Sequence, residues 1–361
     1  MIRVLIAEDS ATLRDLMVNI LSAEPDMSVI ATAVDGVQAV AAVRQLKPDV
    51  VTMDIHMPRM DGFEATRQIM GSYPVPIVIV SGAVTDQVSA TFRAIEAGAL
   101  AFVPQPVASG IGEKRSTAEL VRTVRLMAEV KVVRRWNNSP AVGRPKTTNA
   151  SPGIAARPAA PVLPTLTTVA ASTKSAKMVV IGASTGGPMA LRTILSGLDR
   201  RFPLPILVVQ HISPGFLDGF CEWLGEATTL TVRAAIDGEY PVAGHVYLAP
   251  DGAHMGFRAS GTIFLDKNPA ESGVRPSVSY LFRSAAACVG AEVLAILLSG
   301  MGADGSAELK QLKDLGAITI AQSPDSSAVH GMPGVAIALG GATHILDPEA
   351  VPPLLIQLTG R

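Results

Sequence analysis

The chain has 361 residues, a length that favours about two domains. Hydrophobic residues make up 48% of the sequence and aromatic residues only 4%, so we expect cores of Ala, Val, Leu and Ile, as in α/β proteins. Its 30 basic and 31 acidic residues leave a net charge of −1, which excludes a strong overall attraction to nucleic acid or to an anionic membrane.

The two cysteines, Cys221 and Cys288, lie in helical-looking segments and in no spacing typical of a metal site or a disulfide-rich protein. We therefore expect both thiols to be buried. The first apolar run is too short, and meets Glu8 and Asp9 too early, to be a signal peptide, and no later run reaches membrane-spanning length. We expect a cytoplasmic protein with no membrane insertion.

Residues 1–133 alternate short apolar runs with segments whose apolar residues recur three and four positions apart. This alternation predicts five strand–helix units, and hence a flavodoxin-like domain with a five-stranded parallel sheet. The predicted strands are Arg3–Ala7, Val29–Ala33, Val50–Met53, Pro76–Val80 and Ala101–Val103. The predicted helices are Thr12–Ala23, Gly36–Leu46, Gly62–Met70, Val88–Ala97 and Thr117–Val133.

Residues 134–177 are rich in Pro, Ala, Thr, Ser and Asn and show little periodicity. This composition predicts a linker that is partly extended, because proline restricts the backbone. Packing of its alanines and valines in a domain interface is the alternative.

The strand–helix pattern returns in residues 178–361 and predicts a second, doubly wound α/β domain around a mostly parallel sheet. The predicted strands are Met178–Ile181, Ile206–Gln210, Val246–Ala249, Thr262–Leu265, Val293–Leu298, Ala317–Ala321 and His344–Leu346. The predicted helices are Met189–Leu198, Gly215–Ala227, Val278–Val289, Gly305–Leu315, Met332–Leu339 and Glu349–Leu358.

Three carboxylates follow strands of the first domain. Glu8 and Asp9 end the first strand, and Asp54 ends the third. Because the carboxyl ends of parallel strands share one edge of a sheet, we expect these acids to converge and to repel one another unless a cation such as Mg²⁺ binds them. The alternative is that Asp9 and Ser10 cap the next helix and Asp54 is an ordinary loop acid.

The segment Asp54-Ile-His-Met-Pro-Arg-Met-Asp-Gly62 resembles the one that follows the phosphoacceptor aspartate in response-regulator receivers, and Ser81 stands where that family keeps a hydroxyl. The resemblance covers about 120 residues and implies that Asp54 accepts a phosphoryl group from a histidine kinase. It also implies that Mg²⁺ is held by Glu8, Asp9, Asp54 and the backbone carbonyl of His56. Receivers keep a lysine where this chain has Gln105, and an amide supplies no charge there. We therefore expect phosphorylation to be weakly coupled to the second domain.

The second domain begins with an apolar strand that runs into Gly182-Ala-Ser184-Thr-Gly-Gly187, ahead of a predicted helix. A serine in such a turn meets free N–H groups and the positive end of a helix, which stabilise an oxyanion. The pattern matches the nucleophile elbow of hydrolases, and many ordinary turns also match these five residues. A tight turn with Ser184 as the helix cap is the alternative, whereas a phosphate loop lacks the required glycines and lysine.

A nucleophilic serine needs a base and a group that orients this base. Of six histidines, His211 directly follows a buried strand, so we expect it beside Ser184 at the same edge of the sheet. Asp304 lies in the glycine-rich loop after another buried strand and is the candidate orienting acid. The backbone N–H groups of Thr185 and Met301 are candidate oxyanion donors. An ordinary strand-end histidine and a helix-capping aspartate are the alternatives.

Together these residues resemble the chemotaxis protein-glutamate methylesterases, the CheB family, over nearly the whole chain. The matching segments are Gly-Ala-Ser184-Thr-Gly-Gly, Gln210-His211, Arg275-Pro-Ser-Val278, Gly300-Met-Gly-Ala-Asp304-Gly and Gly331-Met-Pro333. The resemblance implies Ser184 as nucleophile, His211 as general base and acid, and Asp304 as orienting carboxylate. It also places Thr185, Met301, His254 and Arg275 among the residues that line the site. The family often has Asn, an acid and an aromatic residue where this chain has Ala303, Ser279 and His330.

By this resemblance the substrates are methyl-accepting chemoreceptors, whose glutamate γ-methyl esters are hydrolysed and whose glutamines are deamidated. It implies no organic cofactor, with Mg²⁺ needed only in the receiver. A general serine esterase and a catalytically idle signalling adaptor are the alternatives. A DNA-binding response regulator is disfavoured, because the second domain lacks a basic stripe and is far larger than a helix-turn-helix module.

Overall fold

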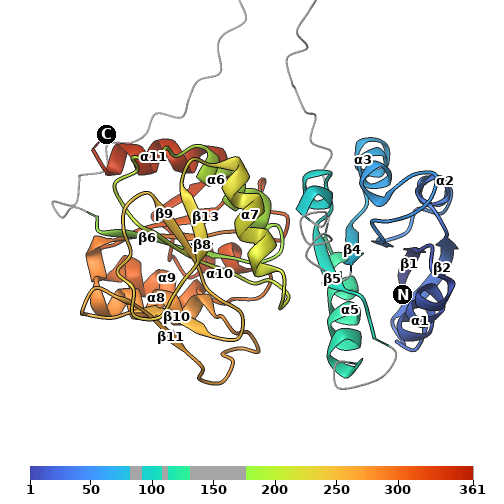
Figure 1. Ribbon diagram of the computed structural model, residues 1–361, viewed down its shortest axis with the longest axis horizontal. Coiled ribbons are helices and arrows are strands. Elements are labelled where there is room, and N and C mark those ends of the chain that lie inside the picture. Colours follow the sequence, from blue (N-terminus) through green and yellow to red (C-terminus); the bar gives the residue numbers. More distant parts are fainter. Residues whose placement is uncertain (82–91, 108–112, 131–175, 361) are drawn as a thin grey trace, which may run out of the picture.

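The computed structural model describes residues 1–81, 92–107, 113–130 and 176–360. They form two α/β domains, one blue to teal and the other green to red in Figure 1. The predicted linker, residues 134–177, lies outside the described residues except for its last two positions, as does the start of the predicted helix Val88–Ala97.

The first domain has a five-stranded sheet in the order β2-β1-β3-β4-β5, and all its strand pairs are parallel. This is the predicted flavodoxin-like arrangement, in which the strand order reverses beside β1 and β3. The strands are β1 (Ile2–Ala7), β2 (Met27–Ala33), β3 (Val50–Met53), β4 (Ile77–Ser81) and β5 (Ala101–Pro104). The helices are α1 (Ala11–Ser22), α2 (Gly36–Leu46), α3 (Gly62–Ser72) and α5 (Glu113–Met127), with residues 92–96 also helical.

Helices cover both faces of this sheet. The core on one face takes side chains from α2 and α3, and the core on the other takes them from α1 and α5. Every residue of β3 is buried, as expected of a strand covered on both faces. Helix α5 begins and ends earlier than the predicted Thr117–Val133.

The second domain is built on a seven-stranded sheet in the order β14-β13-β12-β6-β7-β9-β8, with every strand pair parallel. Its strands are β6 (Met178–Ala183), β7 (Ile206–Gln210), β8 (Thr231–Ala234), β9 (His245–Leu248), β12 (Val293–Leu297), β13 (Ile318–Gln322) and β14 (His344–Leu346). An antiparallel ribbon lies outside this sheet and consists of β10 (His254–Phe257) and β11 (Ile263–Asp266).

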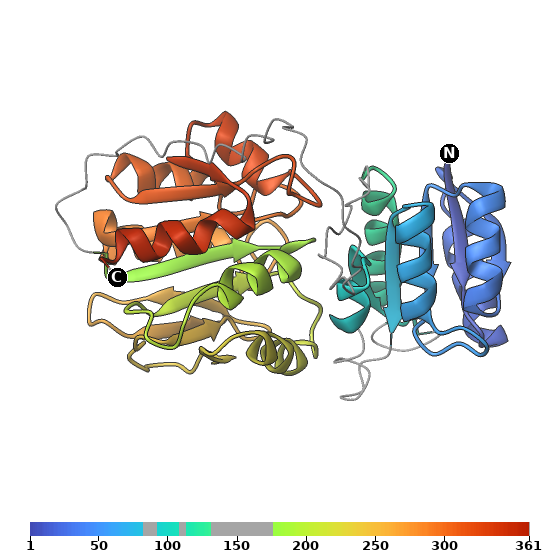
Figure 2. The ribbon, with the colours of Figure 1, turned by 90° about the horizontal axis from the view of Figure 1, so that it is seen from above.

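The helices of the second domain pack in two layers (Figures 1 and 2). One face is covered by α6 (Gly187–Ser196), α7 (Leu217–Ala227) and α11 (Val351–Leu358). The other is covered by α8 (Val278–Cys288), α9 (Ser306–Asp314) and α10 (Met332–Ala338). Short 3-10 helices precede β12 (Gly290–Glu292) and α11 (Pro348–Ala350).

Three further features differ from the sequence predictions. Strand β8 was not predicted because its sequence, Thr-Val-Arg-Ala, has no continuous apolar run. Its side chains are accordingly exposed or only partly buried. Strand β10 was also not predicted, because glycine and histidine interrupt its pattern. The prediction that both cysteines are buried is wrong, since Cys288 is exposed near the end of α8.

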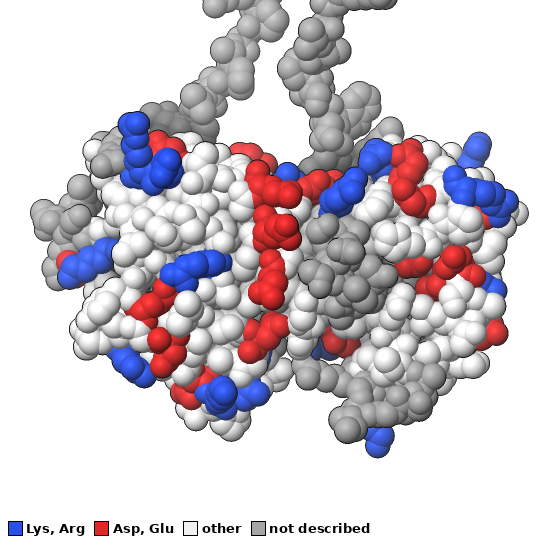
Figure 3. Space-filling model, viewed as in Figure 1, with Lys and Arg blue, Asp and Glu red and all other residues white. Residues whose placement is uncertain are grey.

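No helix among the described residues is both long and apolar enough to cross a bilayer. On the face shown in Figure 3, basic side chains are scattered, whereas acidic side chains gather along the seam between the domains. Helix α7 lies there and exposes Asp218, Glu222 and Glu226. An approaching polyanion would therefore meet like charge on this side of the seam.

Candidate active site

Three neighbouring strands, β12, β6 and β7, end together in the middle of the second sheet. Ser184 follows β6 and His211 follows β7, while Asp304 lies in the loop after β12. Backbone hydrogen bonds tie these exits together, because Ser184 N–H donates to Ser299 O at 3.0 Å and His211 N–H donates to Ala183 O at 2.9 Å. The parallel register therefore brings residues that are far apart in sequence to one edge.

His211 and Asp304 form a hydrogen-bonded pair, with 2.9 Å between Nε2 and Oδ2. This pairing leaves Nδ1 as the ring nitrogen available to Ser184. Both residues are mostly buried, with 15% of the histidine side chain and 6% of the aspartate side chain exposed. No hydrogen bond joins Ser184 Oγ to this ring among the described residues, although both residues line the same cleft.

The Asp304 carboxylate accepts four hydrogen bonds. Besides the imidazole, its donors are the Ser277 hydroxyl at 2.8 Å and the Val278 and Ser279 N–H groups at 2.7 and 2.9 Å. Burial raises the pKa of Asp304, but the bond from His211 and the backbone donors outweigh it and hold the pKa well below its usual range. The aspartate therefore stays ionised at neutral pH and holds the imidazole in one orientation.

Neither Ser184 nor Asp304 caps the helix that follows it in the chain, which was the alternative role for each. Helix α6 is preceded by Gly186 as its cap, with no side-chain hydrogen bond, so Ser184 does not cap it. Asp304 does bind a helix end, but that of α8, which begins 26 residues earlier in the chain. Gly305 caps the helix that follows Asp304.

Gly186 lets the turn after Ser184 approach the loop after β13. Its φ is 76°, and a Cβ at this position would lie 2.5 Å from Ala328 Cβ. Only glycine satisfies both conditions without displacing the neighbouring loops.

The cleft above these residues has a volume of about 550 Å³ and is lined by both domains. From the second domain, Thr185, Arg275 and Met301 line it beside Ser184. The N–H groups of Thr185 and Met301 have no acceptor among the described residues, so both remain available to an oxyanion. Arg275 donates through Nη1 to Lys267 O and Asn268 O, both at 2.9 Å.

The prediction that His254 lines the site needs correction. This residue is fully buried and does not border the cleft. Its Nε2–H donates to Pro269 O at 3.1 Å, and its Nδ1 accepts the Ser277 N–H at 3.2 Å. His254 therefore supports Ser277 from below, and Ser277 in turn donates to Asp304.

The receiver contributes one wall of the cleft, with Phe102, Glu119 and Arg122 among its residues. The Ser213 hydroxyl, in the loop after β7, donates to Glu119 of α5. Two further donors meet Glu96, namely Trp223 Nε1–H at 2.7 Å and the Arg192 guanidinium. The first domain therefore covers the edge of the second sheet that carries Ser184, His211 and Asp304.

Aromatic packing continues this interface. Phe92 is fully buried, and its ring centroid lies 5.1 Å from that of Phe220 and 5.3 Å from that of Trp223. The ring centroid of Phe102 lies 4.7 Å from that of Phe216. Because these rings come from both domains, separating the domains would expose a large apolar surface.

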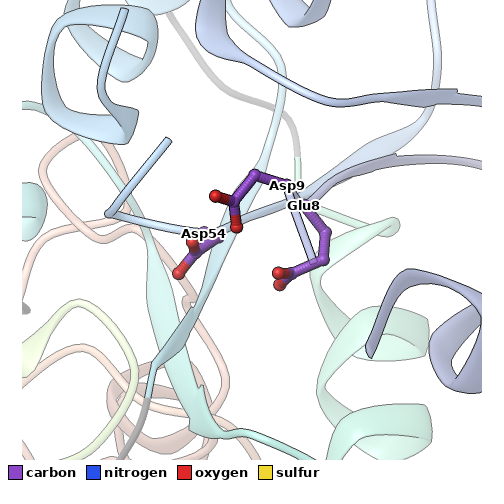
Figure 4. Close-up of side chains that lie close together, drawn as sticks. All are labelled: Glu8, Asp9 and Asp54. Atoms are coloured by element: carbon purple, nitrogen blue, oxygen red, sulfur yellow. The ribbon is translucent and has the colours of Figure 1, made fainter. Parts of the chain in front are cut away.

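In the receiver, the ligand atoms of Glu8, Asp9 and Asp54 all lie within 4.8 Å of one another (Figure 4). Burial and then Asp54 raise the pKa of Glu8 to about 7, and burial and then Asp9 raise the pKa of Asp54. Glu8 Oε2 is buried and has no hydrogen-bond partner in the described part of the chain. A cluster that offers only oxygen ligands, one of them a buried carboxylate oxygen without a hydrogen-bond donor, fits a hard divalent cation such as Mg²⁺.

The remaining receiver residues lie at the expected strand ends. Ser81 ends β4, and Gln105 directly follows β5 and is partly buried. His56 is exposed two positions after Asp54. Ser10 caps α1 through its hydroxyl, as the alternative for this segment proposed, and the Asp9 carboxylate belongs to the acidic cluster instead.

Comparisons with known proteins agree with this architecture. A family model described as "CheB methylesterase" matches residues 179–355, and one described as "Response regulator receiver domain" matches residues 4–111. The chain is 49% identical over 361 residues to protein-glutamate methylesterase/protein-glutamine glutaminase 4 of Geobacter metallireducens, with 99% of each protein covered. It belongs to the CheB family.

A CheB-family protein of Nitrosospira multiformis, named protein-glutamate methylesterase/protein-glutamine glutaminase, is 49% identical over 364 residues and covers 100% of this chain and 98% of its own. The crystal structure of the Thermotoga maritima CheB methylesterase catalytic domain has a TM-score of 0.50 and 40% identity, and covers 51% of this chain and 100% of that one. The CheB family consists of serine hydrolases. The predicted family and α/β fold class are confirmed.

The sequence analysis missed two residues at this CheB site. Ser277 was part of a matching segment, but nothing in its spacing indicated that its hydroxyl binds Asp304. Gln210 is 96% buried beside His211, and its Nε2 donates to two backbone carbonyls, those of Ser184 and His211. For Gln210, the signal available in the sequence was a polar residue at the end of an apolar strand.

Proposed function

We propose that this protein hydrolyses glutamate γ-methyl esters on chemoreceptors, releasing methanol and restoring carboxylates, and that it deamidates receptor glutamines at the same site. The names of its full-length relatives support this activity. The observation that carries it is the His211–Asp304 hydrogen bond in a cleft that Ser184 also lines.

In this mechanism, Ser184 Oγ attacks the ester carbonyl carbon and its proton passes to His211 Nδ1, because Nε2 is held by Asp304. The N–H groups of Thr185 and Met301 stabilise the oxyanion. His211 then protonates the methoxy oxygen, and methanol leaves. Water attacks the acyl-serine, with His211 as base, and releases the glutamate carboxylate and free Ser184. With a glutamine substrate the leaving group is ammonia.

The receiver controls access to this site in our proposal. Asp54 accepts a phosphoryl group from a chemotaxis histidine kinase, and Glu8, Asp9, Asp54 and the His56 carbonyl hold Mg²⁺. When bound, the ion offsets negative charge on the phosphoryl oxygens. The closed arrangement, in which the receiver forms one wall of the cleft, exchanges with an open one that admits the receptor helix.

Gln105 makes this control weaker than in receivers that carry a lysine at this position. A lysine pairs its charge with an acyl phosphate, whereas an amide offers only a neutral hydrogen bond. Phosphorylation of Asp54 therefore contributes less free energy to opening.

Methanol release from a methylated chemoreceptor tests the proposal, measured with and without a small-molecule phosphodonor. We expect release by the wild type and none by Ser184→Ala. Release by Ser184→Ala would contradict the serine mechanism, and an inactive wild type would indicate an adaptor. Equal turnover of simple esters and of methylated receptor would indicate a general esterase.

A further inference from the structure

Two peptide groups at the site have one feature in common, which is that each carbonyl accepts two hydrogen bonds. Ser184 O accepts from Gln210 Nε2 at 2.9 Å and from Gly187 N–H at 2.8 Å. Gly300 O accepts from Gly331 N–H at 3.1 Å and from Met332 N–H at 2.8 Å. Each carbonyl is therefore fixed in direction by two donors.

The other ends of these two peptide groups are the candidate oxyanion donors. The N–H that shares a plane with Ser184 O belongs to Thr185, and the one that shares a plane with Gly300 O belongs to Met301. In a planar trans peptide, the C=O and N–H bonds point in opposite directions. Fixing Ser184 O therefore directs the Thr185 N–H away from Gln210. Fixing Gly300 O directs the Met301 N–H away from the start of α10.

The two peptide groups are also held close together. A Cβ on Gly300 would lie 2.7 Å from Ser184 Cβ, so the loop after β12 passes directly against the nucleophile. A Cβ on Gly331 would lie 2.7 Å from Gly300 O and 3.1 Å from Met301 Cα. The turn that begins α10 can therefore hold Gly300 O only if residue 331 has no side chain.

The orientation of the Gln210 amide follows from its partners. Nε2 donates to Ser184 O at 2.9 Å and to His211 O at 2.8 Å, and both partners can only accept. Rotating the amide would turn Oε1 toward two carbonyl oxygens, so the donor must face them. Oε1 is buried and has no hydrogen-bond partner among the described residues, so the amide is held by its Nε2 end alone.

We propose that Gln210 and the Gly331–Met332 turn are positioning elements that aim the two oxyanion donors by holding the opposite ends of their peptide groups. Gln210 also holds the backbone of the general base through His211 O, and so links nucleophile, base and oxyanion donor. This inference rests on the proposed function and assigns a role to two sequence segments that the triad leaves unexplained. Gln210 borders the cleft but is only 4% exposed, and both of its hydrogen bonds go to backbone carbonyls.

Gln210→Met tests the first element, because methionine keeps the length of the side chain and removes both donated hydrogen bonds. Loss of an oxyanion donor slows comparable hydrolases by about 10²- to 10³-fold. Here the Thr185 N–H is misdirected rather than lost, so we expect kcat to fall by about 10- to 100-fold with an almost unchanged KM. The assay is methanol release by the full chain with saturating phosphodonor.

Gly331→Ala tests the second element by adding one methyl group against Gly300 O. Its φ of −80° suits alanine, so the contact with the backbone is the perturbation. Gly225→Ala is the matched control, since a Cβ there meets no atom of the described residues within 4 Å outside its own helix backbone. Thr319→Val is the control for the loss of a buried hydrogen bond that is remote from the site. The hydroxyl of Thr319 donates to Gly341 O near the opposite end of the strands.

A second readout separates positioning from general damage. Butylboronic acid adds to Ser184 Oγ, whose proton passes to His211, and the tetrahedral boronate places an oxygen in the oxyanion position. We expect Gln210→Met and Gly331→Ala to lose affinity for this probe by the same factor as they lose kcat. The two control variants should keep both values.

A folded Gln210→Met or Gly331→Ala variant with wild-type kcat and boronate affinity would refute the positioning role, as would a loss confined to KM. If one variant fails to fold, the other decides. Methanol release by Ser184→Ala would instead overturn the proposed function. An inactive Ser184→Ala beside fully active positioning variants would refute this inference alone.

Discussion

Replacing Phe92 by alanine should open the enzyme without a phosphoryl group. The Phe92 ring is fully buried and contacts Phe102 of its own domain, but Phe220 and Trp223 belong to α7 of the other domain. A buried Phe→Ala change costs about 3–5 kcal/mol in total. Aromatic pairs contribute about 0.5–1.5 kcal/mol each beyond the area they bury, so the two pairs across the interface account for about 1–3 kcal/mol of the closed arrangement.

A change of this size lowers the closed-to-open ratio by about 5- to 150-fold. We therefore expect methanol release by Phe92→Ala without phosphodonor to rise toward the stimulated wild-type rate, with the stimulated rate little changed. Ile69→Ala is the control, since Ile69 is equally buried in α3 but packs only within the receiver core. It should destabilise the receiver without activating the enzyme.

The result that would refute this reasoning is an unstimulated Phe92→Ala rate equal to that of the wild type. Equal activation by Ile69→Ala would also refute it, because general weakening of the receiver rather than the loss of interdomain packing would then explain the effect.

Three further predictions concern single groups. Asp304→Asn should lower kcat by about 10⁴-fold and the free energy of unfolding by about 1–3 kcal/mol, because an amide N–H then faces donors. The pKa of Asp304 is depressed from 3.8, so its ionised form stabilises the fold above that pH. The difference in free energy of unfolding between the wild type and Asp304→Asn should therefore shrink in more acidic buffer. A difference that stays constant with pH would contradict this. Mg²⁺ should raise the melting temperature of the wild type by binding only the folded state, and Glu8→Gln should lose most of that shift; an undiminished shift would rule out Glu8 as a ligand. Gln105→Lys should respond more strongly to phosphodonor than the wild type in methanol release, and an equal response would show that the amide couples as well as a lysine.

Much of the fold could be predicted from local pattern. Apolar runs identified the central strands, and β3 and β7 have the predicted bounds, because a strand buried on both faces needs such a run. The same logic fails for β8 and β10. Their residues are partly polar, and their pairing depends on strands elsewhere in the chain.

The sequence by itself determined which groups follow which strands, and hence that Ser184, His211 and Asp304 would share one edge of a parallel sheet. Only the tertiary structure decided what surrounds them. Asp304 lies against the start of α8, His254 supports Ser277 below the cleft, and the receiver covers the site. Contacts of this kind join segments that no periodicity relates, so they follow from packing between elements and not from the pattern within any one of them.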